Sequence, residues 1–334
     1  MAVNDPALTR LGWNDTFAAA ARNWPQARPA RVARVDFGRA TVVGSQGIEF
    51  AHLGDQVPAV GDWVLLDCDD IVATLPRTSS FVRGDPMEGK ARKEQVVAAN
   101  IDEVLIVQSL TNGPNVRRLE RELVLAFESG AGPVVVLNKA DAVTDGDIDA
   151  ALVAVAPAAA GVDVLVTSAR TGAGIEALRA RSAGETVALI GASGVGKSTI
   201  VNALVGAEVQ STGDVRPNDQ RGRHTTTARE LVLVPGGGVL VDTPGLRAVS
   251  LWEADDGLSR AFADIEALAE RCRFGDCSHT VEPGCAVRTA IERGELDAAR
   301  FDHYLRLDAE LDEVERRRQG RGGAKAPRNF SNRA

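Results

Sequence analysis

Long apolar runs and cysteines are scarce in this sequence. Nowhere do roughly 18 apolar residues follow one another, so no transmembrane helix is expected. Residues 1–30 lack a basic segment followed by an apolar stretch, so no signal peptide is expected either. Of the four cysteines, three lie between residues 272 and 285 and one stands far away at Cys68, which fits a disulfide framework poorly. The expectation is a cytoplasmic protein without a membrane partner.

Aromatic residues and positive charge are also in short supply. Aromatic residues make up 4% of the chain, so stacking on unpaired bases is less expected than contact with a nucleic-acid backbone. The formal net charge of −8 argues against non-specific attraction of the whole molecule to nucleic acid. With 44% hydrophobic and 25% charged residues, the composition is that of a soluble globular protein. The 334 residues suit two or three domains.

The pattern of apolar, polar and turn residues changes along the chain. Residues 1–30 are predicted to be a helical or loosely ordered extension. Residues 31–88 contain five or six short β-rich pieces, which predict a small β-barrel, with an OB-fold as one option. Residues 89–250 alternate apolar strands with helices, the pattern of a doubly wound, mainly parallel α/β domain. Residues 251–318 are expected to form a helical domain, and residues 319–334 a basic flexible tail.

The predicted barrel strands are bounded by Gly, Asp and Pro. They are Arg31–Phe37, Ala40–Val43, Ile48–His52, Val60–Asp67, Ile71–Leu75 and Ser79–Arg83. The segment of residues 84–95 is predicted to be a linker.

A phosphate-binding loop is predicted at residues 191–198. They read G-A-S-G-V-G-K-S, which matches G-x-x-x-x-G-K-[ST] between the strand TVALI and a predicted helix. Glycines let backbone amides curl around phosphates, and the helix N-terminus adds a favourable dipole. A chance Gly-rich turn is the other interpretation. The expected nucleotide contacts are Gly191, Ala192, Ser193, Gly194, Val195, Gly196, Lys197, Ser198 and Thr199, with Lys197 on the β- and γ-phosphates and Ser198 on Mg²⁺.

A guanine-recognition motif is predicted directly after the strand PVVVL. There the sequence reads Asn138-Lys139-Ala140-Asp141, and a carboxylate at Asp141 can accept two hydrogen bonds that guanine offers and adenine does not. N-K-x-D alone is a weak signal. Ser168 and Ala169, after the strand VDVLV, are expected to bring a backbone amide to the purine oxygen. GTP and GDP are therefore the predicted ligands.

Two further segments point to a magnesium ion and a switch. Asp242, at the end of the strand GGVLV, begins D-T-P-G, in which Asp242 can hold Mg²⁺ through water and the Gly245 amide can sense the γ-phosphate. Residues 221–227 read R-G-R-H-T-T-T, and either Thr226 or Thr227 is the expected second Mg²⁺ ligand, with Thr226 taken provisionally. A β-prone Thr run that starts a strand explains at least one of these threonines.

The order of these motifs is unusual. In an ordinary GTPase the phosphate loop comes first and N-K-x-D comes last, whereas here residues 138–141 and 167–169 precede residues 191–198. Parallel strands can keep their positions in a sheet while the chain is reopened elsewhere, so such a site survives circular permutation. The permutation places D-T-P-G near the C-terminal end of the domain. Loss of the γ-phosphate can therefore directly displace the segment that follows.

A zinc site is predicted from the spacing C-x4-C-x-H-x5-C. Three thiolates and one imidazole form a full tetrahedral set for one structural Zn²⁺ and leave no position for catalytic water. Three buried free cysteines beside a surface histidine would not account for the spacing. The ligands are Cys272, Cys277, His279 and Cys285.

With these residues assembled, the chain resembles the ribosome small subunit-dependent GTPase A (RsgA) family over roughly residues 30 to 290. The resemblance rests on NKAD, TSA, GASGVGKST, GRHTTT, DTPG and the C-x4-C-x-H-x5-C cluster. It implies an OB-fold barrel, a central circularly permuted GTPase and a zinc-containing C-terminal domain. It further implies late maturation of the small ribosomal subunit, with GTP hydrolysis stimulated by that subunit and contacts to its rRNA.

The sequence indicates the catalytic residues less clearly than the residues that bind the nucleotide. Leu246 follows D-T-P-G where many GTPases place the glutamine that orients the attacking water. His224 is the best local substitute, although it could instead contact RNA or solvent. Lys197 is the other residue expected to act in hydrolysis of the β–γ phosphoanhydride of GTP.

The sequence is compatible with two other functions. The chain could act on another RNA particle such as the large ribosomal subunit, or it could be a metabolic kinase, against which Asp141 argues. The barrel and the basic tail are the expected RNA contacts, and a monomer is expected.

Overall fold

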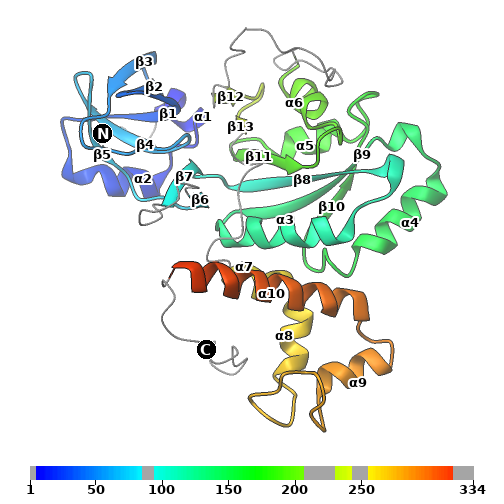
Figure 1. The fold of residues 1–334 in the computed structure, drawn as a ribbon. Coiled ribbons are helices and arrows are strands. Elements are labelled where there is room, and N and C mark those ends of the chain that lie inside the picture. The colour runs from blue at the N-terminus through cyan, green and yellow to red at the C-terminus, as the bar shows by residue number, and fades with distance from the viewer. Residues whose placement is uncertain (1–4, 85–93, 207–229, 243–254, 319–334) are drawn as a thin grey trace, which may run out of the picture. The chain divides into compact units, whose positions relative to one another are not determined.

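The computed structural model describes residues 5–84, 94–206, 230–242 and 255–318 (Figure 1). By its internal contacts the chain divides into two units. One comprises Met1–Pro114 with Ser129–Ser250, and the other comprises Asn115–Glu128 with Leu251–Ala334. Among the described helices, none is both long and apolar enough to cross a membrane.

The first unit contains a five-stranded barrel in its N-terminal part. Its strands are β1 (Arg28–Asp36), β2 (Arg39–Gly44), β3 (Gly47–His52), β4 (Trp63–Asp67) and β5 (Asp70–Thr74), in the closed order β1-β2-β3-β5-β4. Neighbours pair antiparallel except for β3 and β5, which are parallel. Alternate apolar residues point inward, and they include Ala40, Val42, Val64 and Leu66. The prediction of an OB-type barrel is confirmed.

The sixth predicted strand does not join the barrel. β6 (Ser80–Gly84) pairs antiparallel with β7 (Glu94–Ala99) in a separate two-stranded sheet. The prediction of a linker at residues 84–95 therefore overlaps β7 at its C-terminal end. The polar residues of 84–95 hid the start of this strand, whose apolar part begins at Val96. Residues 85–93 lie outside the described part of the chain.

The segment before the barrel is helical. It forms α1 (Pro6–Arg10), α2 (Asp15–Ala20) and the 3₁₀ turn η1 (Ala21–Asn23). The Asp5 and Asn14 side chains accept hydrogen bonds from the first backbone amides of α1 and α2, which caps both helices. A second core of the unit joins these helices to the barrel through Leu8, Leu11, Trp13, Phe17, Trp63 and Leu65.

A six-stranded sheet is the largest sheet of the first unit. Its order is β10 (Asp163–Val166), β9 (Gly132–Asn138), β8 (Glu103–Ser109), β11 (Thr186–Gly191), β13 (Val239–Asp242) and β12 (Glu230–Leu233). All neighbours are parallel except β12 and β13. The helices α4 (Asp145–Val155), α5 (Ile175–Arg181) and α6 (Lys197–Val205) alternate with these strands along the chain. The prediction of a doubly wound, mainly parallel sheet is confirmed.

The second unit is helical. It contains α3 (Val116–Glu128), α7 (Asp255–Ala261), α8 (Ala263–Ala269), α9 (Ala286–Glu292) and α10 (Ala298–Arg318). The α7 backbone comes so close to α3 that a Cβ at Gly257 would lie 2.4 Å from the Val124 carbonyl oxygen. Although α3 lies between β8 and β9 in sequence, within the predicted domain of residues 89–250, its contacts group it with the C-terminal helices.

A buried ionic cluster joins three helices of this unit. The Arg300 guanidinium on α10 donates to Glu120 on α3 at 2.7 Å and to Asp264 on α8 at 2.7 and 2.9 Å. His303, one turn further along α10, lies 2.5 Å from the other Glu120 oxygen. The side chains of Arg300 and Glu120 are 5% and 2% exposed, so these charges depend on one another rather than on water.

Candidate nucleotide site and metal centre

The predicted nucleotide motifs follow the carboxyl ends of parallel strands. The N-K-A-D segment begins at the last residue of β9, T-S-A follows β10, and the phosphate loop begins at the last residue of β11. Ligand sites in open α/β sheets form at this edge. In chain order β9 and β10 precede β11, yet in the sheet β8 alone separates β9 from β11. Loops met in permuted order therefore lie at one edge.

Two glycines of the phosphate loop are required by close contacts. A Cβ at Gly191 would lie 2.4 Å from the Val107 carbonyl oxygen, and one at Gly196 would lie 2.3 Å from Asn138 Nδ2. Both residues also have positive φ, 140° and 101°. No other residue type meets both demands. Gly196 directly precedes α6, so the loop ends at a helix N-terminus.

Asn138 connects the three loops. Its side chain is buried, and its Nδ2 donates to the Val195 carbonyl oxygen at 2.9 Å. Its Oδ1 accepts from the Ala169 amide at 3.1 Å and from the Thr167 hydroxyl at 3.2 Å. One side chain thus holds the N-K-A-D, T-S-A and phosphate loops in a fixed arrangement.

The two lysines of the motifs both contact the phosphate loop. Lys139, held at a φ of 69°, donates from Nζ to the Gly194 carbonyl oxygen at 2.5 Å. Lys197, which is buried, donates from Nζ to the carbonyl oxygens of Gly191 and Ala192 at 2.8 and 2.6 Å. These cations therefore lie on the loop that is predicted to bind the phosphates.

Asp141 lies beside the T-S-A loop. Its Oδ1 accepts from the Ser168 hydroxyl at 2.5 Å, and its Oδ2 lies 3.6 Å from the exposed Arg170 guanidinium. The backbone amide of Ala140 donates to the Thr167 carbonyl oxygen at 3.0 Å. The Asp141 carboxylate is thus positioned by neighbours from the loop that follows β10.

The remaining nucleotide residues divide into two groups. Ser198 and Thr199 lie half-buried in the first turn of α6, Ala192 is half-buried, and Ser193 is exposed. Asp242 is the last residue of β13, and its backbone pairs with Glu230. The Asp242 side chain and all of His224, Thr226, Thr227 and Gly245 lie outside the described residues.

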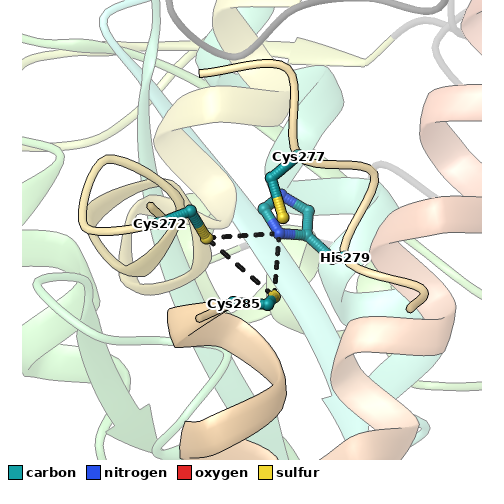
Figure 2. A group of neighbouring side chains, drawn as sticks. All are labelled: Cys272, Cys277, His279 and Cys285. Carbon is teal, nitrogen blue, oxygen red and sulfur yellow. Dashed lines mark hydrogen bonds between the residues drawn. The ribbon is translucent and has the colours of Figure 1, made fainter. Parts of the chain in front are cut away.

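The four predicted zinc ligands come together in the helical unit (Figure 2). Their ligand atoms all lie within 4.8 Å of one another. Cys272 Sγ lies 3.5 Å from His279 Nδ1 and 3.9 Å from Cys285 Sγ, and His279 Nδ1 lies 3.4 Å from Cys285 Sγ. In a tetrahedron with Zn–S bonds of about 2.3 Å, the sulfur atoms are about 3.8 Å apart. The donor set therefore fits a zinc ion, and the sulfur separation is too long for a disulfide.

Local backbone structure holds these ligands in place. Cys285 is the N-cap of α9, and its Sγ accepts from the Arg288 amide at 3.4 Å. Cys272 Sγ accepts from the Ala286 amide at 3.3 Å. His279 has a φ of 60°, the left-handed conformation of a tight turn.

The loop that carries His279 is organised by Glu282. Its carboxylate accepts hydrogen bonds from the Ser278 amide and hydroxyl and from the amides of Thr280 and Val281, at 2.5 to 3.1 Å. The Ser278 hydroxyl above all, together with the backbone amides, lowers the pKa of Glu282 to about 2. The carboxylate is therefore ionised at neutral pH and fixes the loop between two zinc ligands.

Burial controls the protonation of the ligand cluster. It raises the pKa of Cys277 to about 12, with smaller contributions from the Cys285 and Cys272 thiols, and it lowers the pKa of His279. Both shifts favour neutral ligands. A divalent cation reverses this preference at the thiols, because it stabilises thiolates.

Sequence reasoning overlooked two residues beside these sites. Arg170, next to T-S-A, faces the Asp141 carboxylate, and Glu282 shapes the ligand loop. Arg170 had no motif to mark it. Glu282 lies four residues after Ser278, and this spacing of a hydroxyl and a carboxylate in a short loop is its only signal in the sequence.

Comparison with known proteins points to one family. The sequence pattern of the RsgA GTPase family matches residues 74–252. "Small ribosomal subunit biogenesis GTPase RsgA" of Streptomyces coelicolor is 42% identical over 344 residues, covering 99% of this chain and 93% of that protein. The protein of the same name from Streptomyces avermitilis is 47% identical over 289 residues, covering 83% and 78%.

Two solved structures have the same fold. The crystal structure of YjeQ from Thermotoga maritima matches with a TM-score of 0.62 at 26% identity, covering 85% of this chain and 98% of YjeQ. YloQ, described as a circularly permuted GTPase, matches with a TM-score of 0.61 at 22% identity, covering 89% and 98%. The permuted motif order, the geometry at the sheet edge and these similarities lead to one conclusion: the chain belongs to the RsgA family of circularly permuted GTPases.

Proposed function

We propose that this protein is a GTP-hydrolysing switch in late maturation of the small ribosomal subunit, and that this subunit stimulates its hydrolysis. The observation that carries the GTPase part is the position of Asn138, which bonds to Val195 and to Ala169 and so unites the base and phosphate loops. The ribosomal part rests on the names of relatives that are 42–47% identical over most of the chain.

The base and the phosphates of GTP or GDP would be bound by different loops. Asp141 would accept the guanine N1–H and 2-amino hydrogens, while Ser168 and Ala169 border the base and Asn138 and Lys139 fix the loop. Backbone amides of residues 191–199 would surround the phosphates at the N-terminus of α6. The Lys197 amine, which donates to two loop carbonyls, is the cation that would turn to the β- and γ-phosphates.

Magnesium and zinc would have separate roles. Ser198 and Thr226, with Thr227 as the alternative, would ligate Mg²⁺ together with Asp242, and the ion would neutralise charge on the β- and γ-phosphates. Gly245 would sense the γ-phosphate. Cys272, Cys277, His279 and Cys285 would hold one zinc ion, and because they complete its coordination the role is structural.

Hydrolysis needs a group that positions water. Leu246 stands in the usual place of a glutamine, so we assign water positioning to His224 and charge stabilisation to Lys197. A group supplied only when the subunit docks would make intrinsic hydrolysis slow. His224→Ala should abolish most of the stimulated turnover and leave GTP affinity within about twofold of the wild type, and unchanged stimulated turnover would remove His224 from this role.

The proposed partner surface combines the barrel with the basic tail, most of which lies outside the described residues. Of the aromatic residues between 31 and 88, Phe37 and Phe50 are exposed, while Trp63 and Phe81 are buried and so unavailable to RNA. Residues 316–334 contain seven Lys or Arg and no acid, so they suit rRNA phosphates. The protein would act in the cytoplasm as a monomer.

GTP turnover with purified subunits tests the proposal. We expect a large rise with small subunits, no comparable rise with large subunits, and none with Lys197→Ala. Equal stimulation by both subunits would favour a different RNA particle as the partner. Absence of stimulation by either subunit would refute the ribosomal role.

Base specificity is tested separately. GTP should bind and ATP should not, and Asp141→Asn should shift the preference from GTP to xanthosine triphosphate because the amide complements xanthine. Equal binding of ATP and GTP by the wild type would instead support a kinase-like function.

A further inference from the structure

Arg31 is a cation buried in the first unit. It lies on β1 and is only 1% exposed, yet within the described part of the chain no carboxylate lies within hydrogen-bonding distance of its guanidinium. Instead it donates to the carbonyl oxygens of Leu11, of Gly61 at 3.1 Å and of Asn100 at 2.8 Å, and to the Thr186 hydroxyl at 2.8 Å. Four of its five N–H groups thus contact four different segments.

These segments belong to different parts of the unit. Leu11 follows α1 in the N-terminal segment, Gly61 precedes β4 of the barrel, and Asn100 follows β7. Thr186 is the first residue of β11, the strand that leads to the phosphate loop. Arg31 therefore joins the N-terminal segment and the barrel to the start of the phosphate-loop strand.

Thr186 is held from both sides. Its backbone amide donates to Asp102 Oδ2 at 2.7 Å, and its carbonyl oxygen accepts from the Asp102 amide at 2.8 Å. Its hydroxyl accepts from Arg31. β11 then runs from Thr186 to Gly191 and pairs with β8 from Val187 onward, so one continuous strand connects Thr186 to the phosphate loop roughly 17 Å away.

The N-terminal segment also contacts the second strand that leads to the nucleotide site. The core formed by Leu8, Leu11, Trp13 and Phe17 includes Val239, the first residue of β13, with Leu231 of β12 packed against it. β13 ends at Asp242, the expected magnesium residue. β11 and β13 therefore both begin at the barrel side of the sheet and end at the nucleotide side. Figure 1 shows α1 beside β1 on the barrel side.

Nearby charges keep Arg31 in its cationic form. Burial lowers the pKa of Arg31 to about 10, while the Asp102 and Asp62 carboxylates oppose this shift. Asp62 is itself paired with Arg77 at 2.7 Å. At neutral pH the guanidinium is thus charged, and its hydrogen bonds to carbonyl oxygens are of the stronger, charge-assisted kind.

We propose that Arg31 is a positioning residue that, together with the helical segment of residues 5–27, couples the barrel to the nucleotide site through β11 and β13. A partner that docks on the barrel would change the nucleotide site through Arg31 and Thr186, at the end of the sheet remote from the phosphates. The proposal gives the N-terminal segment a function and rests on the proposed stimulation by the small subunit.

The test uses three full-length variants. Arg31→Met removes all four hydrogen bonds, and Thr186→Val removes only the one from Arg31 while keeping the shape of the side chain. Arg34→Met, on the same strand, is the matched control, because Arg34 is partly exposed and pairs only with Asp36 among the contacts of the described residues. GTP turnover is measured with and without increasing concentrations of small subunits.

The expected result separates coupling from docking. With Arg31→Met and Thr186→Val, the maximal stimulated kcat should fall about tenfold, within the usual range of coupling between sites. The half-saturating subunit concentration, the unstimulated turnover and the GDP affinity should stay within about twofold of the wild type. A rise in the half-saturating concentration at unchanged kcat, or full stimulation of Thr186→Val, would overturn the proposal. If Arg31→Met does not fold, Thr186→Val decides.

A measurement without ribosomes keeps this test independent of the proposed partner. In the wild type and in Arg34→Met, GDP should slow amide hydrogen exchange in β1 (residues 28–36), and this slowing should be lost in Thr186→Val at equal nucleotide occupancy. If GDP leaves exchange in wild-type β1 unchanged, the coupling does not exist. If GDP slows it but subunits never stimulate hydrolysis, the proposed function fails while the coupling stands.

Discussion

Asn138 donates a hydrogen bond from its Nδ2 to the backbone carbonyl oxygen of Val195, 2.9 Å away and 57 residues further along the chain. The first residue ends β9, and the second lies in the phosphate loop after β11. In an unpermuted GTPase the corresponding motifs follow one another in the opposite order. The contact therefore depends on strand positions in the sheet and not on the order in which the chain visits them.

Replacing Asn138 should weaken nucleotide binding. Asn138→Ala leaves the Val195 carbonyl oxygen and the Ala169 amide without this partner, at a cost of about 1–3 kcal/mol for each buried group that is left unsatisfied. Part of that cost falls on the loop arrangement, so we expect GDP affinity to fall about tenfold or more. Titration with a fluorescent GDP analogue measures it. Asp145→Asn, at an exposed position in the nearby first turn of α4, is the control and should bind as the wild type does; equal affinities of all three would contradict the prediction.

A Cβ at Gly196 should be more damaging than backbone strain alone. Gly196→Ala places a methyl group 2.3 Å from Asn138 Nδ2 at a φ of 101°. Gly161→Ala has a positive φ of 76° but no atom within 4 Å of the added methyl group, so it isolates the strain, which costs about 1–3 kcal/mol. We expect both variants to be destabilised and Gly196→Ala alone to lose GDP binding, as measured by thermal unfolding and nucleotide titration. Normal GDP binding by Gly196→Ala would show that the loop can move away from Asn138.

The architecture was predictable from the sequence because its signals are local. A closed barrel of short strands, a mainly parallel sheet and C-terminal helices follow from apolar spacing and turn residues, and the structure confirms them. Both ends of α6 are also marked in the sequence, by the Gly-rich loop before Lys197 and by Gly206 after Val205. The proximity of residues 138–141 to residues 191–198 followed from motif order and the rules of parallel sheets.

Long-range packing was not predictable in the same way. Nothing around Arg31 marks it as buried, because its partners are backbone carbonyls in segments that only the fold brings together. The same holds for α3, whose sequence position suggests the central domain while Glu120 and Gly257 tie it to C-terminal helices. β7 was missed since its polar start resembles a loop. In each case the deciding interaction joins residues distant in sequence.

Zinc binding should release protons. Burial raises the pKa of Cys277 to about 12, so in the metal-free protein this thiol is protonated at neutral pH. Each thiol must lose its proton to bind zinc, so we expect release of about one proton per thiol ligand at pH 7 and an affinity that decreases as the pH falls. Zinc titration calorimetry in two buffers of different ionisation enthalpy measures this release.

The control for zinc binding is Cys68→Ser. Cys68 is exposed and lies outside the cluster, so this variant should bind one zinc ion with the same proton release. Cys277→Ser should lose most of the affinity, and Glu282→Gln should raise the zinc dissociation rate because the His279 loop loses its organising carboxylate. A heat of binding that is independent of the buffer would rule out protonated thiols in the metal-free state.

The start of α4 should make stability depend on acid pH. Asp147 and Thr144 form a capping box, and hydrogen bonds from the Thr144 amide and hydroxyl hold the pKa of Asp147 below its usual 3.8. A carboxyl group with a lowered pKa stabilises the fold above the unfolded value and loses this effect as the pH falls below it. We therefore expect Asp147→Asn to be less stable than the wild type at pH 7, with the difference shrinking below pH 3.8. Asp145→Asn, which leaves the box intact, should show no such convergence; thermal unfolding across a pH series decides.

Breaking the buried cluster of the helical unit should cost far more than breaking a surface pair. Arg300→Met leaves the Glu120 carboxylate, 2% exposed, with His303 as its remaining partner in the cluster, and loss of one member of a buried pair costs about 3–5 kcal/mol. Arg121→Met removes a pair with Glu310 between the same two helices, α3 and α10, but those side chains are 35% and 43% exposed, so the cost should be about 0–1 kcal/mol.

The measurement is hydrogen exchange of α3 and α10 as a function of denaturant, which reports this unit apart from the rest of the chain. Glu120→Gln combined with Arg300→Met should recover part of the loss, because no uncompensated carboxylate then remains buried beside His303. If Arg300→Met and Arg121→Met destabilise these helices equally, the Glu120 carboxylate must reach water or another cation, and the cluster would not be what joins α3 to α10.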